Sequence, residues 1–241
     1  MTFARLFLLL ALLAFVVEPG PRLRIPARIR SWLRNRRNRS GAGASAAARA
    51  RQLRTPSVRI ADHLGIPTQR SRQAARWEAG AAGERRTAAR LAELEREGWT
   101  VLHDRALPYG RANVDHLVIS PRGRVYLPDT KRWSSRWPVT VHYGRLFHGD
   151  RDVTDRLNGL RHEASVVAGV LVTSVRPLVV LDGPPVPAEG LVVDGLRIVA
   201  ADQLCQTLRA LDATARTAHR ARGPLAALAD QLLPPYQQGH R

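Results

Sequence analysis

The chain has 241 residues, of which 44% are apolar, and a formal net charge of +18 at pH 7. This length allows one domain of ordinary size with extensions, and the apolar content can fill a core. A single cysteine, Cys205, excludes an internal disulfide framework and a cysteine zinc cluster, and is typical of a reducing compartment. Excess positive charge on this scale predicts an acidic partner, either nucleic acid or anionic lipid.

Residues 1–20 contain an uninterrupted apolar run at 6–17, LFLLLALLAFVV. Counted from Met1, the segment reaches about 17 residues, the low end for crossing a bilayer. Eight arginines lie between positions 22 and 39, against one before the run, and this asymmetry predicts a cell-membrane anchor with everything downstream in the cytoplasm. The alternatives are a signal peptide and a start codon assigned too far upstream, the latter leaving a cytoplasmic protein.

Residues 21–70 are rich first in arginine and then in small residues. Apolar side chains recur at helical spacing in the first part: Ile25, Ile29, Trp32 and Leu33. Such a basic amphipathic helix would lie on an anionic membrane surface or follow a phosphate backbone. Residues 40–56 show no strong periodicity, so we expect a linker there.

The compact domain is expected over residues 71–199. It opens with a helical pattern at 71–97, in which Gly80 and Gly83 indicate a boundary or a close backbone approach. Short β-prone runs follow, separated by turns typical of an antiparallel meander: 99–104, 114–119 and 125–127. A further hairpin is expected around Gly144.

Helices and strands alternate in the rest of the chain. The predicted elements are a helix at 155–172, a buried strand at 177–181, a small hairpin at 191–199 and helices at 201–211 and 224–233. Residues 200–241 would thus be a C-terminal helical extension. The order of elements predicts an α/β fold, with a mixed sheet covered by helices.

Lysine occurs once, although the chain has 37 arginines. Lys131 ends the triplet Asp129-Thr130-Lys131, just after a strand-like apolar run. An ammonium group is a compact charge that can hold a water or steady a developing anion, whereas a guanidinium group is delocalised. The triplet is therefore the first candidate for an active site, and the alternative is a leftover surface lysine beside a chance aspartate.

Two further carboxylates can join Lys131. If the intervening Ser-Pro-Arg-Gly segment forms a tight turn, Asp115 lies opposite a position near Pro128 or Asp129 on the next strand. Paired carboxylates a few ångströms apart suit Mg²⁺ or Mn²⁺. Lys131 points to the same side of its strand as Asp129. Glu84, on the preceding helix, could add a third carboxylate, or it could cap a helix or pair with a neighbouring arginine.

Three segments in order resemble the successive motifs of the NERD (nuclease-related) domain: Gly80–Glu84, Asn113–Ile119 and Asp129–Trp133. The resemblance covers residues 75–182 and implies the PD-(D/E)xK nuclease-like superfamily, whose restriction-endonuclease-like core has the order α-β-β-β-α-β. It implies that Asp115 and Asp129 are catalytic metal ligands and that Lys131 is the catalytic lysine. Glu84 would be the acidic residue carried by the helix, with a catalytic role and as a further metal ligand.

Two segments depart from the family pattern. Pro128 stands where a β-branched residue is expected. Because proline cannot donate to a sheet ladder, this strand must lie at an edge or leave the sheet there. On the second helix, Arg161-His162-Glu163 replaces a stretch that usually contains glutamine, so we assign no role to it.

Basic and aromatic residues follow the lysine. Arg132, Trp133 and Arg136 are predicted to bind nucleic acid. Trp133, Trp137 and Tyr143 could stack on bases, although packing beside the hairpin is the more common fate of such aromatics.

The sequence favours a metal-dependent nuclease that acts on DNA, with RNA as an alternative substrate, tethered to the cytoplasmic side of a membrane. The competing hypothesis is a nuclease-like module that holds nucleic acid without cutting it, in a DNA-processing or plasmid-transfer assembly. A third possibility takes the basic segment 22–39 as purely lipid-directed.

Overall fold

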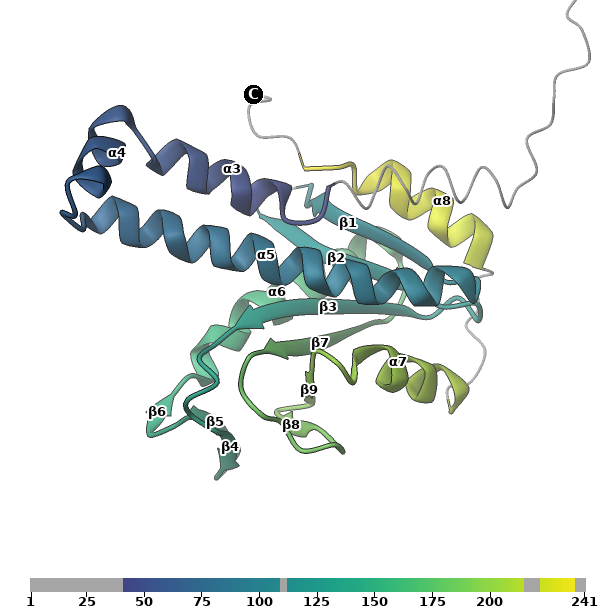
Figure 1. Ribbon diagram of the computed structural model, residues 1–241. Coiled ribbons are helices and arrows are strands. Elements are labelled where there is room, and N and C mark those ends of the chain that lie inside the picture. The colour runs from purple at the N-terminus through teal and green to yellow at the C-terminus, as the bar shows by residue number, and fades with distance from the viewer. Residues whose placement is uncertain (1–40, 109–111, 215–221, 237–241) are drawn as a thin grey trace, which may run out of the picture. The chain divides into compact units, whose positions relative to one another are not determined.

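The computed structural model describes residues 41–108, 112–214 and 222–236 (Figure 1). Its helices are α3 (Ala44–Leu53), α4 (Pro56–His63), α5 (Gln69–Arg96), η1 (Thr154–Leu157), α6 (Asn158–Leu171), α7 (Leu204–Ala213) and α8 (Arg222–Leu232). Within these residues no helix has the length and apolar character needed to cross a membrane. The expected anchor and the basic amphipathic segment both lie outside them.

The strands form one large sheet and one small sheet. They are β1 (Thr100–Ala106), β2 (Asn113–Ile119), β3 (Val125–Arg132), β4 (Val139–His142), β5 (Arg145–His148), β6 (Arg151–Asp152), β7 (Val175–Asp182), β8 (Leu191–Val193) and β9 (Leu196–Ala200). The large sheet has the order β1-β2-β3-β7-β9-β8, and the small sheet contains β4, β5 and β6.

The large sheet is mixed, as predicted. β1, β2 and β3 form the antiparallel meander, and α6 then carries the chain across to β7, which is parallel to β3. β9 is parallel to β7, and β8 closes the sheet as an antiparallel edge strand. The order α5-β1-β2-β3-α6-β7 confirms the predicted α-β-β-β-α-β core.

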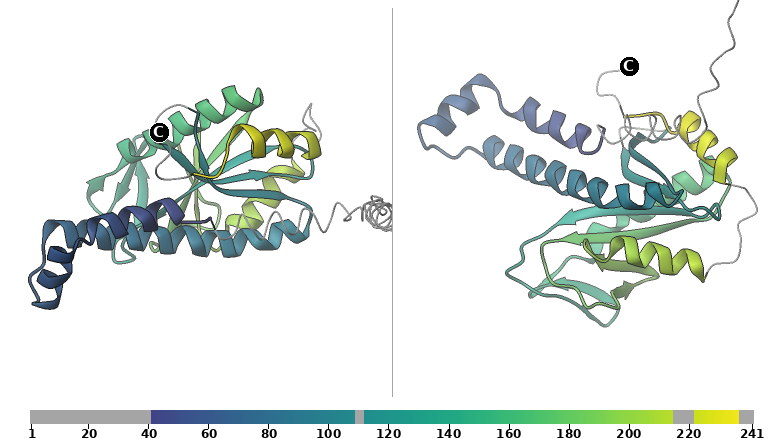
Figure 2. Two further views of the ribbon diagram at one scale, coloured as in Figure 1. Left: turned by 90° about the horizontal axis from the view of Figure 1, so that it is seen from above. Right: turned by 45° about the vertical axis from the view of Figure 1, so that its right-hand side comes forward.

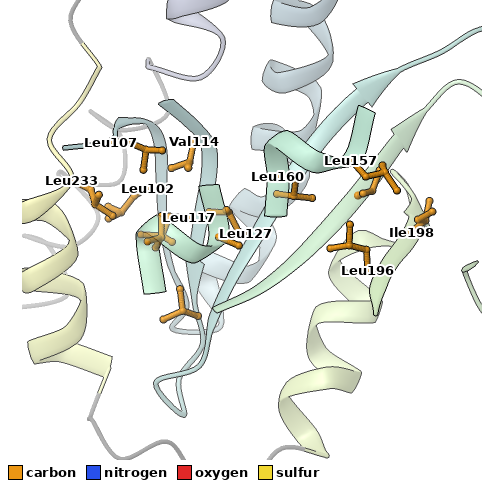
Figure 3. Packing of buried hydrophobic residues seen from close by; sticks show 14 of the residues in the cluster. Leu102, Leu107, Val114, Leu117, Leu127, Leu157, Leu160, Leu196, Ile198 and Leu233 are labelled. Carbon is orange, nitrogen blue, oxygen red and sulfur yellow. The ribbon is translucent and has the colours of Figure 1, made fainter. Parts of the chain in front are cut away.

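Helices cover both faces of the large sheet. α6 and α8 lie on one side and α5 on the other, as the left view of Figure 2 shows. Because successive strand residues point to opposite faces, each face has its own apolar cluster. Figure 3 shows part of the cluster beneath α6 and α8, including Leu117, Leu127 and Leu160. The cluster beneath α5 and α7 includes Leu91, Val118 and Leu204.

α5 is one continuous helix, so neither glycine marks a boundary. Gly83 instead marks a close approach to β3. A methyl group added at this position would lie 3.4 Å from Cγ2 of Thr130. The Thr130 hydroxyl in turn lies 2.9 Å from that of Thr87, one helical turn further along. The small residue therefore lets the helix lie directly on the strand that carries the candidate lysine.

The linker expected at residues 40–56 is wrong for most of that stretch, because it contains α3. Alanine has the highest helix propensity, and small side chains allow α3 to pack closely along α5, with Ala46 and Ala50 buried. Gly43 precedes α3 with a φ of 71°, and a methyl group there would lie 2.7 Å from the carbonyl oxygen of Ala81. The periodic pattern of apolar residues did not predict this helix, because alanines occur on all its faces and so mark no apolar stripe.

The C-terminal residues pack on β1, the outer strand of the meander. Ala106 donates its N–H to the carbonyl of Pro234 (2.8 Å), and Tyr236 donates to that of Asp104 (2.7 Å). Beneath this bridge, Arg105 is fully buried and donates to the carbonyl oxygens of Leu233 and Asp230. The edge of β1 is thus covered by the end of the described chain.

The small sheet contains the predicted hairpin. Tyr143 and Gly144 form its two-residue turn with φ values of 50° and 73°. Positive φ at both central positions is typical of the type I′ turn, which matches the twist of the flanking strands. In Figure 1 this sheet lies below the end of β3, and its strand β4 contacts β8 of the large sheet.

Candidate active site

The candidate site lies where β2 and β3 separate. These strands pair only at Val118–Tyr126 and Ile119–Val125, whereas β3 stays paired with β7 as far as Arg132. Pro128 follows two residues after the last β2 pair. The strand that contains Pro128 is central, so the expectation of an edge strand is wrong. The expectation that the strand leaves the sheet there is right on the β2 side, because the hydrogen-bond ladder with β2 stops before Pro128, which has no N–H to donate.

Asp115 on β2 and Asp129 on β3 both lie beyond the last of these pairs. Continuing the observed register would place these two residues opposite each other. Asp129 is only 7% exposed, and its Oδ2 lies 2.7 Å from Nζ of Lys131. Burial lowers the pKa of Lys131, but the Asp129 and Asp115 carboxylates outweigh this effect, so the net pKa is raised. Lys131 is therefore a fixed cation at neutral pH and not a proton acceptor.

Asp115 and Glu84 are destabilised in their charged forms. Enclosure of the Asp115 carboxyl group raises its pKa well above the ordinary value, and the carboxylates of Glu84 and Asp129 raise it further. Burial raises the pKa of Glu84 to about 7, with Asp104 and Asp129 adding to the increase. These mutual effects require the carboxyl groups of α5, β2 and β3 to lie close together.

The start of α3 holds two of the acidic groups. A hydrogen bond from the Gly43 N–H favours ionised Glu84. Asp104 accepts hydrogen bonds from the Ser45 N–H and from Nδ2 of Asn113, each at 2.8 Å. Asp104 was not singled out from the sequence. It lies in a left-handed backbone conformation inside β1, where the pairing with β2 skips it between His103 and Arg105, and no local pattern predicts its contact with α3.

Glu163 on α6 also belongs to this group, although no role was assigned to its segment from the sequence. Burial raises the pKa of Glu163 to about 7, with Asp129 adding to the increase and Lys131 opposing it. One signal could have found it. Glu163 lies three residues after buried Leu160 and four before buried Val167, so it places a carboxylate on the apolar stripe of the helix.

An open cleft of about 620 Å³ adjoins Lys131. Residues of α5, the end of β3 and the loop after β3 line it, including Arg76, Arg132 and Ser134. Nη1 of Arg132 lies 3.4 Å from Oδ2 of Asp182, which also pairs with Arg86. The cleft wall therefore combines positive charge with main-chain and hydroxyl groups suited to a phosphate backbone.

The aromatic residues after the lysine divide into packed and exposed ones. Trp133 is partly buried, with its ring 5.3 Å from that of His148 and the Arg156 guanidinium 5.8 Å from its centre. Trp137 is 49% exposed, and the Arg136 guanidinium lies 5.2 Å from the centre of its ring. Tyr143 is fully exposed at the hairpin turn. Trp133 is thus packed beside the hairpin, Trp137 is half exposed, and Tyr143 is fully exposed.

The acidic groups do not form a ready-made metal centre. In the described part of the chain, no three His, Cys, Asp or Glu side chains are grouped so that they could hold a metal ion as they stand. Buried Oε2 of Glu84 nevertheless accepts no hydrogen bond from the described residues. An oxygen of this kind, beside carboxylates that oppose each other's ionisation, suits a divalent cation.

Replacing Glu84 by glutamine is expected to stabilise the metal-free protein more at pH 8 than at pH 4.5. The folded-state pKa of about 7 lies above the ordinary 4.5. Between these values the unfolded chain releases a proton that the folded chain keeps, so stability falls as pH rises. Thermal unfolding in EDTA across this range would check the prediction. A difference between variant and wild type that did not change with pH would contradict it.

Glu78→Gln provides the matched control on the same helix. A hydrogen bond from Arg54 lowers the pKa of Glu78, so the sign of its pH effect is reversed. This exposed pair is expected to change stability only slightly.

A mixed sheet of this order, with acidic residues and a lysine where two strands separate, defines a restriction-endonuclease-like fold. Residues 79–193 match the family model of NERD, the nuclease-related domain. No curated protein and no solved structure matches the chain.

Proposed function

We propose that the chain is a metal-dependent nuclease that cleaves DNA. One observation carries the proposal: the carboxyl groups of Glu84, Asp115 and Asp129 converge beside Lys131, at the separation of β2 and β3. The nuclease-related domain supports a function of this general kind. The basic cleft beside Lys131 supports nucleic acid as the partner.

Different residues of the site would have different roles in phosphodiester hydrolysis. Lys131, held by Asp129, would stabilise the negative charge that develops on the phosphate, and it would help to orient the attacking water. Asp115, Asp129 and Glu84 would hold Mg²⁺ or Mn²⁺, which when bound polarises the phosphate and lowers the pKa of water. Arg132 and Arg136, beside Trp133, would keep the strand in the cleft.

Manganese is expected to stabilise the wild-type protein at pH 8. Binding to the folded state alone contributes about 2.7 kcal/mol when the metal is present at about 100 times its Kd. Asp129→Asn removes one charge from the candidate ligand group while keeping its shape, so its Tm should not respond. Thermal unfolding with Mn²⁺ and with EDTA measures this without relying on activity. An equal increase in Tm for both proteins would place the metal elsewhere.

Cleavage of supercoiled plasmid by the full chain tests the nuclease itself. With Mg²⁺ or Mn²⁺ we expect nicked and linear products, and with EDTA we expect none. Cleavage that persisted in EDTA would exclude a metal mechanism. Failure to cut plasmid, single-stranded DNA or RNA with either metal would exclude the nuclease.

The second candidate is a module that holds nucleic acid without cutting it. Two observations favour it: Asp129 is already engaged by Lys131, and no metal-ready group exists among the described residues. It predicts salt-sensitive DNA binding that does not depend on Mg²⁺ or on Asp129. Binding measured with and without metal, for wild type and Asp129→Asn, separates the two.

We further propose that residues 1–20 tether the protein to a membrane with its domain in the cytoplasm. The apolar run and the arginines after it support this orientation. A cluster of exposed aliphatic residues near α4, Ile60, Leu64 and Ile66, would suit contact with the same surface. Fractionation of cells that express the chain with and without residues 1–20 tests it, and a deletion variant that stayed in the membrane fraction would contradict it.

A further inference from the structure

We propose that the outer face of the small sheet binds an unpaired nucleobase, and that the substrate is therefore single-stranded nucleic acid or a duplex with a single-stranded stretch. This inference rests on the proposed function, since it specifies which nucleic acid reaches Lys131. It is carried by the side chains of β4 and β5 and by the tryptophan that precedes them.

The small sheet has one buried face and one open face. Val139, Val141 and Leu146 point inward and join the core or pack against it. The alternate positions point outward, and the register sets Thr140 opposite Phe147 and His142 opposite Arg145. The rings of His142 and Phe147 lie 5.9 Å apart on this face. The solvent-facing side of the small sheet thus carries aromatic rings, whereas polar residues are usual on such a face.

A groove of about 580 Å³ follows this open face. Three ring-bearing side chains line it: Trp137, His142 and Phe147. Trp137 lies against Gly149, where an added methyl group would be 3.4 Å from the Trp137 Cβ and Cγ atoms. The glycine therefore lets the indole approach the turn closely. Trp137 is half exposed, and accessible aromatic rings bind bases by stacking with little regard for sequence.

Charge favours a nucleic-acid strand as the occupant of the groove. Arg136 lies over the Trp137 ring, and Arg145, which pairs with Asp152, is exposed on the open face of the small sheet. Guanidinium groups at these positions can neutralise phosphates and can stack on bases. Asp150 lines the groove itself, where its carboxylate would repel a phosphate but accept hydrogen bonds from the amino groups of a base. The groove therefore suits the base, and the arginines suit the backbone.

The groove continues the candidate active site along the chain. Trp133, Ser134 and Ser135 line the cleft beside Lys131, and Trp137 and Pro138 line the groove. Only one residue, Arg136, therefore separates the segments that line the two hollows. A strand whose base stacks on Trp137 would have a neighbouring phosphate directed toward Lys131. Bases inside an intact duplex cannot make this contact without leaving the stack.

Binding of a fluorescent oligonucleotide to the full chain, in EDTA and at constant salt, tests the inference. The same sequence is offered as a single strand and as a duplex. We expect tighter binding of the single strand, and an approximately tenfold loss of that affinity in Trp137→Ala, since stacking contributes about 1–3 kcal/mol per base. Trp137→Phe should recover most of it. Trp77→Ala is the matched control, because Trp77 is 40% exposed on α5 and lines neither hollow.

The outcomes separate this inference from the proposed nuclease. Unchanged single-strand binding in Trp137→Ala, an equal loss in Trp77→Ala or an equal loss for the duplex would overturn it, as would failure to bind either form. Parallel cleavage assays with Mn²⁺ test the nuclease. Binding that depends on Trp137 without any cleavage would support the base-binding groove and contradict the nuclease. Cleavage of duplex DNA that does not depend on Trp137 would support the nuclease and contradict the base-binding groove.

Discussion

Lys131→Ala is expected to reduce cleavage by about 10²- to 10³-fold, the usual cost of removing one group that stabilises transition-state charge. The physical reason is the ion pair with Asp129, which fixes the ammonium beside the carboxylates and keeps it charged. Single-turnover cleavage of plasmid would measure the loss. The side chain is partly exposed, so the variant should keep its fold, and thermal unfolding would verify this.

Lys131→Arg is the informative control in a chain whose other basic residues are all arginine. It keeps the positive charge but replaces a compact ammonium by a larger, delocalised guanidinium. If the site needs the compact group, this variant should still lose most of its activity. Activity near that of wild type in Lys131→Ala would remove Lys131 from the mechanism, whereas full activity in Lys131→Arg alone would reduce its role to charge.

Arg105→Met is expected to destabilise the domain by about 3 kcal/mol. Methionine fills much of the volume, so the loss reflects mainly the hydrogen bonds. The Leu233 carbonyl would lose its donor in a buried place, and α8 would lose its attachment to β1. Urea unfolding measures the difference in free energy. A change below about 1 kcal/mol would show that α8 is held by apolar contacts alone.

Arg209→Met is the matched control for Arg105→Met. Arg209 also binds several oxygens, those of Glu93 and Glu97, but all three side chains are substantially exposed. Exposed ion pairs contribute about 0–1 kcal/mol because water and salt screen them. The two arginines therefore have similar partners and should differ severalfold in their effect on stability.

Residue spacing was sufficient to predict the register of the hairpin formed by β2 and β3. A tight turn fixes that register, so Asp115 was expected opposite Pro128 or Asp129, and extending the observed pairs gives Asp129. Pro128 was correctly linked to a break in a ladder. Its assignment to an edge strand was wrong because a missing N–H affects pairing on one side only, and β3 keeps β7 on the other.

What the sequence could not predict depends on contacts between distant segments. α3 lies on α5 through small residues that carry no periodic signal, and Asp104 meets Ser45 across 59 positions of the chain. Glu163 did carry a signal, a carboxylate on an apolar stripe, but its meaning depends on where α6 crosses the sheet. Helix and strand patterns record which face is buried and not which element covers it.

The bridge between β1 and the last described residues has a consequence for protein synthesis. The two partners, Arg105 and Pro235, are separated by more than half of the chain. Until the ribosome has added residues 233–236, β1 lacks the segment that covers its edge, and the guanidinium of Arg105 has no Leu233 carbonyl to bind. The nascent domain therefore cannot complete this side of its core until translation reaches the C-terminal segment, and until then β1 is open to pairing with other chains.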